Sequence, residues 1–227
     1  MWSVILAAGM GIRLQREETD KPKPLLSVGD ETFLDSLYKM LNVFSEKIVV
    51  VGGHGYHYLE QWANDKENVI TVFNPEYKDT GNSLSALLGL MLVPEKQSVI
   101  LTDGDVLIKY QYLEILAKEN GSAFLVSKTE LDSEAMKAHI EDGCIVDLGK
   151  AIVGEAETIG MQKLSAKMVE SYIWHFDRER HIDGYYEDVI RELLKKECIK
   201  PIWVKETDWA EVDTLEDLKR AKMLGLI

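Results

Sequence analysis

The sequence predicts an α/β fold: a mixed, mainly parallel β-sheet with helices on both faces, completed by a small C-terminal β-hairpin and helical portion. Two observations lead to this prediction. Short apolar runs alternate with longer segments of helical period through residues 1–130, and the connections between them are short. One of these runs, residues 47–51 (KIVVV), is β-branched and uninterrupted, as expected of a strand covered on both sides.

The N-terminal part supplies most of the predicted sheet. The apolar runs expected to form its strands are residues 2–6, 47–51, 69–73, 98–102 and 122–128. The helices expected between them are residues 33–44, with i, i+3, i+4 apolar spacing, a short segment carrying Leu59 and Trp62, and residues 83–93 and 112–118. Asn82 or Ser83 is suited to cap the helix at residues 83–93. A long polar loop, residues 7–31, follows the first strand.

After residue 130 the pattern changes. Residues 135–140 and 144–148 predict a β-hairpin, because the intervening Asp142-Gly143 suits the positive φ angles of a type I′ turn. Further strands are expected at residues 157–164 and 199–205, and helices at residues 165–176, 186–196 and 215–224, the last with Thr214 as cap. No linker divides the chain, so we expect one domain over residues 1–227.

The composition excludes several classes of protein. The 227 residues carry a formal net charge of −13, which opposes long-range attraction to nucleic acid or to anionic lipid. No apolar stretch approaches the roughly 20 residues that span a bilayer, so we expect no membrane partner. Cys144 and Cys198 lack any metal-like spacing and are expected to be ordinary thiols in a reducing compartment. Together these features indicate a cytoplasmic protein.

The loop after the first strand contains the densest chemical signal. Gly9 and Gly11 let main-chain N–H groups surround an anion, and Arg13 adds a planar donor suited to phosphate oxygens. Lys23, between two prolines, has a restricted backbone and can aim its charge at a reacting phosphoryl group. A parallel sheet binds ligands at the carboxyl ends of its strands, where this loop begins. We therefore predict phosphate binding rather than a purely structural turn.

Two familiar phosphate-binding motifs do not account for the loop. A dinucleotide-binding fingerprint needs a third glycine where Leu14 stands, and a helix that starts promptly. A Walker loop needs Gly-Lys-Ser/Thr, which this loop lacks.

The whole chain resembles the nucleotidyltransferases that join a nucleoside triphosphate to a phosphorylated sugar or alcohol. The opening pattern of that family is matched by Leu6-Ala7-Ala8-Gly9, by GxGxR from Gly9 to Arg13, and by Pro22-Lys23-Pro24. Its other site segments are matched by residues 80–86 (TGNSLSA), 101–105 (LTDGD) and 209–214 (WAEVDT). The resemblance implies a Rossmann-like sheet, with residues 1–130 as a nucleotide-binding half and residues 131–227 as an acceptor-binding half.

The resemblance also implies a Mg²⁺-dependent attack of an acceptor phosphate or phosphonate oxygen on the α-phosphorus, releasing pyrophosphate. Lys23 and Arg13 are the implied catalytic residues, and Asp105 and Asp213 the implied metal ligands. The implied nucleotide-binding residues are Leu6, Ala7, Ala8, Gly9, Gly11, Arg13, Lys23, Asn82, Ser83 and Asp103. Glu187 and Gly160 are the implied acceptor-binding residues. Glu211 is a further metal candidate, because it lies two positions before Asp213.

This chemistry agrees with the residue types. An ionised phosphate needs no general base, so catalysis can consist of positioning and charge neutralisation. Mg²⁺ prefers one or two carboxylates together with phosphate oxygens and water.

The short chain, the Asn82-Ser83 segment and the WxxVDTxED ending resemble the CTP-using branch of that family. The expected partners are therefore CTP and a phosphorylated small molecule. Residues 140–143 (IEDG) and 148–150 (LGK), with the ending, most resemble the inositol-1-phosphate enzymes, so inositol-1-phosphate is the best match. Phosphocholine, 2-aminoethylphosphonate and a hexose-1-phosphate stay open, and Tyr185, Tyr186 and Trp174 could form an aromatic cage for choline. Two other functions remain possible from the sequence: a glycosyltransferase with an Asp-x-Asp motif, and a non-catalytic nucleotide sensor. The sequence is also compatible with a homodimer. The presence of Lys23, Asp105 and Asp213 together favours an enzyme.

Overall fold

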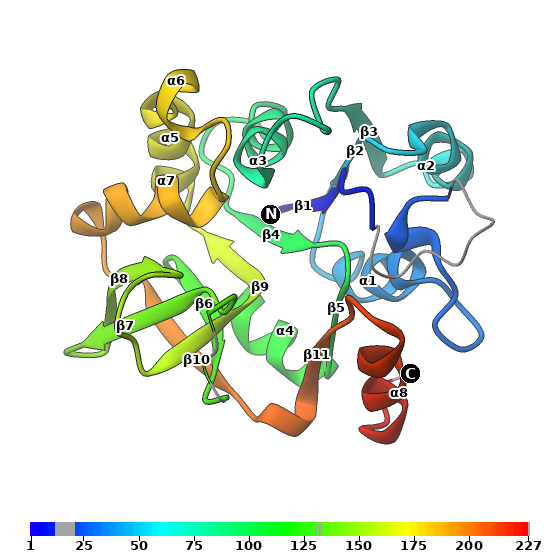
Figure 1. The fold of residues 1–227 in the computed structure, drawn as a ribbon. Coiled ribbons are helices and arrows are strands. Elements are labelled where there is room, and N and C mark those ends of the chain that lie inside the picture. Colours follow the sequence, from blue (N-terminus) through cyan, green and yellow to red (C-terminus); the bar gives the residue numbers. More distant parts are fainter. Residues whose placement is uncertain (12–20, 130, 132, 227) are drawn as a thin grey trace.

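A long mixed sheet forms the middle of the molecule (Figure 1). The structure is a computed structural model that describes residues 1–11, 21–129, 131 and 133–226. The main row of strands, in spatial order, is β10 (Lys200–Val204), β6 (Ala123–Ser127), β9 (Ala156–Leu164), β4 (Val99–Asp103), β1 (Trp2–Ala7), β2 (Ile48–Gly52) and β3 (Val69–Phe73). A hairpin of β7 (Lys137–Glu141) and β8 (Cys144–Gly149) joins this row through β9.

One strand of the main row runs against the others. β1 pairs in parallel with β2 and β4, and β10 pairs in parallel with β6, whereas β9 is antiparallel to both β4 and β6. The predicted mixed, mainly parallel α/β sheet is thus confirmed. β9, from residues 131–227, lies between β6 and β4 from residues 1–130, and β10 extends the row beside β6, so the two predicted halves share one sheet.

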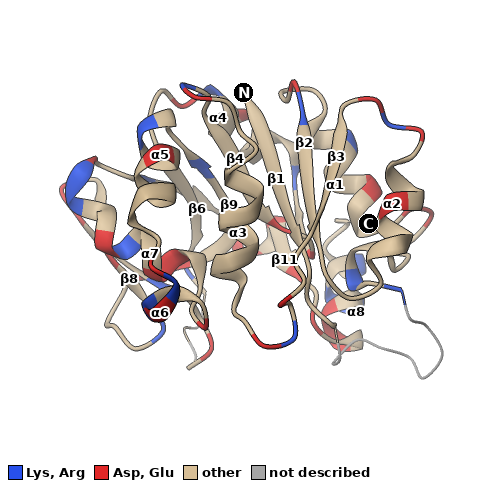
Figure 2. Cartoon of the chain, turned by 90° about the horizontal axis from the view of Figure 1, so that it is seen from above, with Lys and Arg blue, Asp and Glu red and all other residues tan. Residues whose placement is uncertain are grey.

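Helices cover both faces of the sheet, as predicted. One core contains side chains of α3 (Asn82–Leu90), α5 (Ala166–His175) and α7 (Tyr186–Leu193). The opposite core contains side chains of α1 (Phe33–Leu41), α2 (Tyr56–Ala63) and α4 (Tyr110–Lys118). In Figure 2 the helices α3, α5 and α7 lie on the near side of the strands, and most charged residues lie on helices and loops, whereas β1 and β2 contain none.

A small third hydrophobic core lies beside the main sheet. The strands β5 (Val106–Ile108) and β11 (Trp209–Glu211) form an antiparallel pair, against which α8 (Leu215–Met223) packs. The sequence analysis did not identify β5, β11 or the short helix α6 (Arg178–His181), because three or four residues carry too little periodicity. Short 3-10 turns occupy Lys23–Leu25, Leu194–Lys196 and Glu206–Asp208.

Two of the three local predictions for turns and helix caps agree with the structure. Asp142 and Gly143 have φ angles of 50° and 77°, which agrees with the predicted type I′ hairpin turn. Thr214 caps α8 by accepting a hydrogen bond from the backbone N–H of Asp217. The predicted cap of α3 is wrong: Gly81 is the N-cap, and the side chain of Asn82 instead accepts a hydrogen bond from the backbone N–H of Tyr186.

The expectation of two ordinary thiols is also wrong, because Cys144 and Cys198 form a disulfide. The bond joins the start of β8 to the segment before β10, where the backbone N–H of Ile145 also donates to the carbonyl oxygen of Ile199. The two cysteines are 54 positions apart, so their proximity depends on the tertiary fold and not on local spacing. The reducing compartment inferred from the cysteines therefore loses its basis. Within the described part of the chain, no helix combines the length and the apolar character that a membrane crossing needs.

Candidate active site

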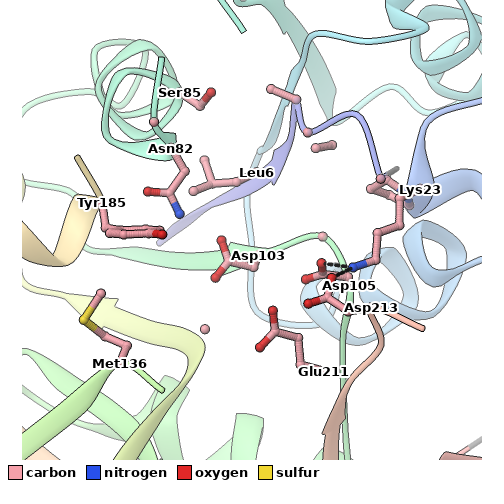
Figure 3. Close-up of a pocket in the computed structure, with 18 of the residues that line it drawn as sticks. Leu6, Lys23, Asn82, Ser85, Asp103, Asp105, Met136, Tyr185, Glu211 and Asp213 are labelled. Atoms are coloured by element: carbon pink, nitrogen blue, oxygen red, sulfur yellow. Dashed lines mark hydrogen bonds and ion pairs between the residues drawn. The ribbon is translucent and has the colours of Figure 1, made fainter. Parts of the chain in front are cut away.

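A cavity of about 700 Å³ opens at the carboxyl ends of β1 and β4. Its wall comprises residues 6–11, 23, 24, 74, 77, 80–82, 85, 103–105, 134, 136, 150, 157, 158, 160, 185, 187, 211 and 213. Figure 3 shows Lys23, Asp105 and Asp213 at one end of this cavity, Tyr185 and Met136 at the other, and Asp103 between them. The position agrees with the general preference of parallel α/β sheets for ligands beyond their carboxyl strand ends.

The glycine-containing loop, predicted to bind phosphate, lines the cavity over residues 6–11. At Gly9 an added Cβ would meet no atom within 4 Å, so its main chain is open to approach. Gly11 has a φ of 59°, and a Cβ there would lie 2.8 Å from Cβ of Lys23. Gly11 therefore lets the loop pass closely over Lys23. Arg13, predicted to bind the triphosphate, lies outside the described residues.

Lys23 is the centre of a buried charge cluster. Its Nζ donates hydrogen bonds to Oδ2 of Asp105 at 2.5 Å and to Oδ1 of Asp213 at 2.6 Å. Pro22 and Pro24, on either side of this lysine, restrict its backbone at the start of the 3-10 turn, and the residue is 7% exposed. Burial lowers the pKa of Lys23, but the two carboxylates raise it more, so its pKa is higher than usual and the amine is charged.

Asp105 and Asp213 approach the lysine from two elements that pair with each other. Asp105 follows β4 and directly precedes β5, and Asp213 follows β11, the antiparallel partner of β5. The backbone N–H of Val212 donates to the carbonyl oxygen of Asp105 at 3.2 Å, which fixes the two segments side by side. The pairing of two three-residue strands thus brings together the two carboxylates predicted to bind metal.

Glu211 completes a group of three carboxylates. One oxygen from each of Asp105, Glu211 and Asp213 lies within 4.8 Å of the others. Glu211 is exposed to the cavity, yet the surrounding protein atoms and the charges of Asp105 and Asp213 raise its pKa to about 8. Oδ1 of Asp105 is buried and has no hydrogen-bond partner. A set of oxygen donors with one unsatisfied buried oxygen fits Mg²⁺, which takes carboxylate, phosphate and water oxygens.

Asp103 lies in the middle of the cavity, at the end of β4. Its Oδ2 accepts a hydrogen bond of 3.2 Å from Oη of Tyr186. Burial, together with the charges of Glu187 and Asp105, raises the pKa of Asp103 well above its usual range. Gly160, with a φ of 70°, lies against this carboxylate: an added Cβ would be 2.6 Å from Oδ2 of Asp103. No larger residue would fit beside Asp103 at this point of the cavity wall.

The segment predicted to bind the base and ribose divides into lining and structural residues. Asn82 lines the cavity, whereas Ser83 is fully buried, is not part of the cavity wall and donates from Oγ to the carbonyl oxygen of His181 at 2.5 Å. Ser85, two positions later on α3, does line the cavity and accepts a hydrogen bond from Nδ2 of Asn74. Asn74, Tyr77 and Thr80 also line the cavity, and like Ser85 they were not predicted as site residues, although Thr80 and Ser85 belong to the TGNSLSA segment.

The predicted acceptor-binding residues Glu187 and Gly160 both line the cavity. Glu187 is 5% exposed, and its Oε2 has no hydrogen-bond partner. The aromatic cage left open by the sequence is not present among the described residues: Trp174 is 83% exposed and outside the cavity wall, and Tyr186 is fully buried with its hydroxyl bonded to Asp103. Tyr185 alone of these three rings lines the cavity.

Known proteins resemble this chain over its whole length. It is 27% identical over 97% of its length to a "Bifunctional IPC transferase and DIPP synthase" of Archaeoglobus fulgidus, of which it spans only 43%. It is 26% identical to a "CTP:phosphoglutamine cytidylyltransferase" of Campylobacter jejuni, with 96% of this chain and 98% of the relative covered. Among solved structures, the inositol-1-phosphate CTP transferase of T. maritima matches with a TM-score of 0.81 and 25% identity, covering 99% of this chain and 94% of that one.

A further comparison concerns the family as a whole. Residues 3–168, well over half of the chain, match the MobA-like NTP transferase domain. This match includes the glycine-containing loop, Lys23, the TGNSLSA segment and Asp105. On this evidence the chain belongs to the family of MobA-like NTP transferase domains.

Proposed function

We propose that this chain is a Mg²⁺-dependent cytidylyltransferase that transfers CMP from CTP to a phosphorylated small alcohol, with inositol-1-phosphate as the best candidate, and releases pyrophosphate. Support comes from the relatives, which include enzymes named as cytidylyltransferases for phosphoglutamine and for phosphocholine. The structural similarity to the inositol-1-phosphate CTP transferase of T. maritima supports the choice of acceptor.

The observation that carries this proposal is the position of Lys23 and its carboxylate partners beside the glycine-containing loop. In the proposed reaction an oxygen of the acceptor phosphate forms a bond to the α-phosphorus. The bond from that phosphorus to the bridging oxygen of the β-phosphate breaks, and pyrophosphate leaves with the electron pair. The attacking oxygen is already ionised, so no proton transfer is required and no general base is assigned.

Each charged group then has a distinct role. The N–H groups of residues 9–11 and the guanidinium of Arg13 bind the triphosphate, and Lys23 stabilises the charge that develops on the α-phosphate. Asp105 and Asp213, with Glu211 beside them, would hold the metal ion. When bound, Mg²⁺ neutralises phosphate charge in a cavity whose wall is otherwise rich in carboxylates. Asn82 and Asp103 contact the nucleoside, and Glu187 and Gly160 contact the acceptor.

A screen of pyrophosphate release tests this proposal. Each of the four ribonucleoside triphosphates is combined with Mg²⁺ and with inositol-1-phosphate, phosphocholine, 2-aminoethylphosphonate or a hexose-1-phosphate. We expect release with CTP and inositol-1-phosphate, and loss of that release in the Asp105→Asn variant. Activity only with a hexose-1-phosphate would overturn the choice of acceptor and leave the reaction class intact. The absence of pyrophosphate release with every pair would favour a nucleotide sensor instead.

A further inference from the structure

A lysine forms part of the cavity wall at the end remote from Lys23. Lys150 follows β8, lines the cavity, and holds its Nζ 4.5 Å from the ring centroid of Tyr185 and 3.1 Å from Oε2 of Glu134. The turn that carries it is fixed because Nζ of Lys137 donates to the carbonyl oxygen of Lys150 at 2.7 Å. The side chain is 30% exposed, so its charge is only partly screened by solvent.

This lysine occupies the place that a cationic acceptor would need. A quaternary ammonium group binds best over the face of an aromatic ring. Among the described residues, the cavity wall contains the rings of Tyr77 and Tyr185, and Tyr77 packs against Gly53, after β2. Tyr185 already has an ammonium group of the protein beside its ring. A second cation brought to this ring would meet the repulsion of Lys150 in a partly desolvated site.

The same end of the cavity offers groups suited to hydroxyls. Oε2 of Glu187 and Oγ1 of Thr158 are buried without hydrogen-bond partners, and both residues line the cavity while being 5% and 6% exposed. A buried polar atom without a partner is costly unless a ligand or water satisfies it. An alcohol hydroxyl donates to a carboxylate and accepts from a lysine, so a ligand with several hydroxyls satisfies Glu187, Thr158 and Lys150 together.

We propose that Lys150 selects the acceptor, favouring a phosphorylated polyol that has no cationic group over a phosphorylated compound that carries an ammonium group. Lys150 does so by donating to acceptor hydroxyls and by keeping the ring of Tyr185 from an ammonium ligand. This inference rests on the proposed function and makes its substrate class specific. It makes Lys150, which was not among the predicted site residues, a specificity-determining residue.

The test compares two acceptors in two lysine variants. The ratio of kcat/KM for inositol-1-phosphate to kcat/KM for phosphocholine is measured by pyrophosphate release at saturating CTP. We expect Lys150→Met, which keeps an unbranched side chain one atom shorter and removes the charge, to lower this ratio about tenfold or more, through a loss with inositol-1-phosphate and a gain with phosphocholine. The Lys137→Met variant loosens the same turn without removing a charge from the cavity wall, and should leave the ratio unchanged.

Three results would overturn the inference. An equal loss of kcat/KM for both acceptors in Lys150→Met would mean that the lysine binds the phosphate they share. An equal change of the ratio in Lys150→Met and Lys137→Met would assign the effect to the position of the turn. Wild-type activity with phosphocholine alone would reject the selectivity and leave the cytidylyltransferase reaction standing, whereas wild-type silence with both acceptors would reject the proposed function itself.

Discussion

Nζ of Lys23 lies 2.5 Å from Oδ2 of Asp105, and the same amine also reaches Asp213. The lysine proposed to stabilise the α-phosphate is thus the counterion of the two carboxylates proposed to hold the metal. Two of the three N–H donors of this ammonium group are taken by the carboxylates. We expect a bound metal–nucleotide complex to draw the carboxylates to the metal and to shift Lys23 from carboxylate oxygens toward phosphate oxygens.

This exchange predicts that Lys23 competes with a divalent cation when nucleotide is absent. In the Lys23→Met variant the carboxylates lose their internal cation, so we expect Mn²⁺ alone to bind about tenfold more tightly than to the wild type. Calorimetry or the electron paramagnetic resonance signal of free Mn²⁺ measures this affinity without any turnover. The Lys39→Met variant removes an exposed lysine paired with Glu31 and serves as control. Equal or weaker Mn²⁺ binding in Lys23→Met would contradict the competition.

Removal of the Lys23 charge also tests the class of reaction. For Lys23→Ala we expect kcat/KM for CMP transfer to fall by an amount equal to about 3 kcal/mol of transition-state stabilisation, as for the loss of one preorganised charge donor. A glycosyltransferase that uses Asp103 and Asp105 would not depend on this loop and would lose little. Steady-state rates of pyrophosphate release decide between the two, and near-normal turnover in the variant would reject the role of Lys23.

The sequence predicted the parts of the site that are local in the chain. Residues 6–11 and Lys23 are adjacent to one strand end, so a pattern of glycines, prolines and a strand signal was sufficient to place them. Asp105 and Asp213 were identified through the family resemblance, but their approach depends on the pairing of β5 with β11. Three-residue strands leave no periodic signal, so the sequence contained no direct evidence for that pairing.

Other residues were misassigned because their partners are distant in the chain. Ser83 was predicted to be a nucleotide ligand or a helix cap. In the structure the segment around His181 packs on the start of α3, and the hydroxyl of Ser83 donates a hydrogen bond to the carbonyl oxygen of His181. Lys150 was not predicted as a site residue, because its relation to Tyr185 exists only once β8 and α7 are packed together. Residue type and spacing identify groups able to do chemistry, whereas the tertiary fold decides which of them face the cavity.

Gly160 should tolerate no side chain. Its φ of 70° is strained for other residues, and a Cβ would lie 2.6 Å from Oδ2 of Asp103. We expect Gly160→Ala to lower the free energy of unfolding by about 2–4 kcal/mol and to reduce activity by displacing Asp103. Gly121→Ala is the matched control, because Gly121 has no positive φ and an added Cβ there meets no atom within 4 Å. Urea unfolding of both variants makes the comparison, and similar midpoints would show that the Gly160 backbone relaxes freely.

The disulfide between Cys144 and Cys198 should contribute strongly to stability. It closes a loop across 54 positions, and the chain-entropy relation gives a stabilisation of about 4 kcal/mol for such a loop. We expect the double variant Cys144→Ser, Cys198→Ser to unfold at lower denaturant concentration than the oxidised wild type. Dithiothreitol should shift the wild type toward the variant and leave the variant unchanged. Insensitivity of the wild type to dithiothreitol would show that the bond adds no stability.

Glu187 should make the folded protein less stable as the pH rises. Burial raises the pKa of this carboxyl from its ordinary 4.5 to about 7, so between these values the folded chain holds a proton that the unfolded chain has released. The free energy of unfolding must therefore fall as the pH rises through this range, by up to about 3 kcal/mol from this group. The Glu187→Gln variant removes that contribution and should show a shallower fall than the wild type. Denaturant unfolding of both proteins from pH 4.5 to 8 measures the difference, in which the contribution of Glu211 largely cancels. The charge of Glu187 also raises the pKa of Asp103, so the loss of that part of the shift in Glu187→Gln adds to the shallower fall. Parallel stability profiles would mean that Glu187 titrates alike in the folded and unfolded chains, and hence that water reaches its carboxylate.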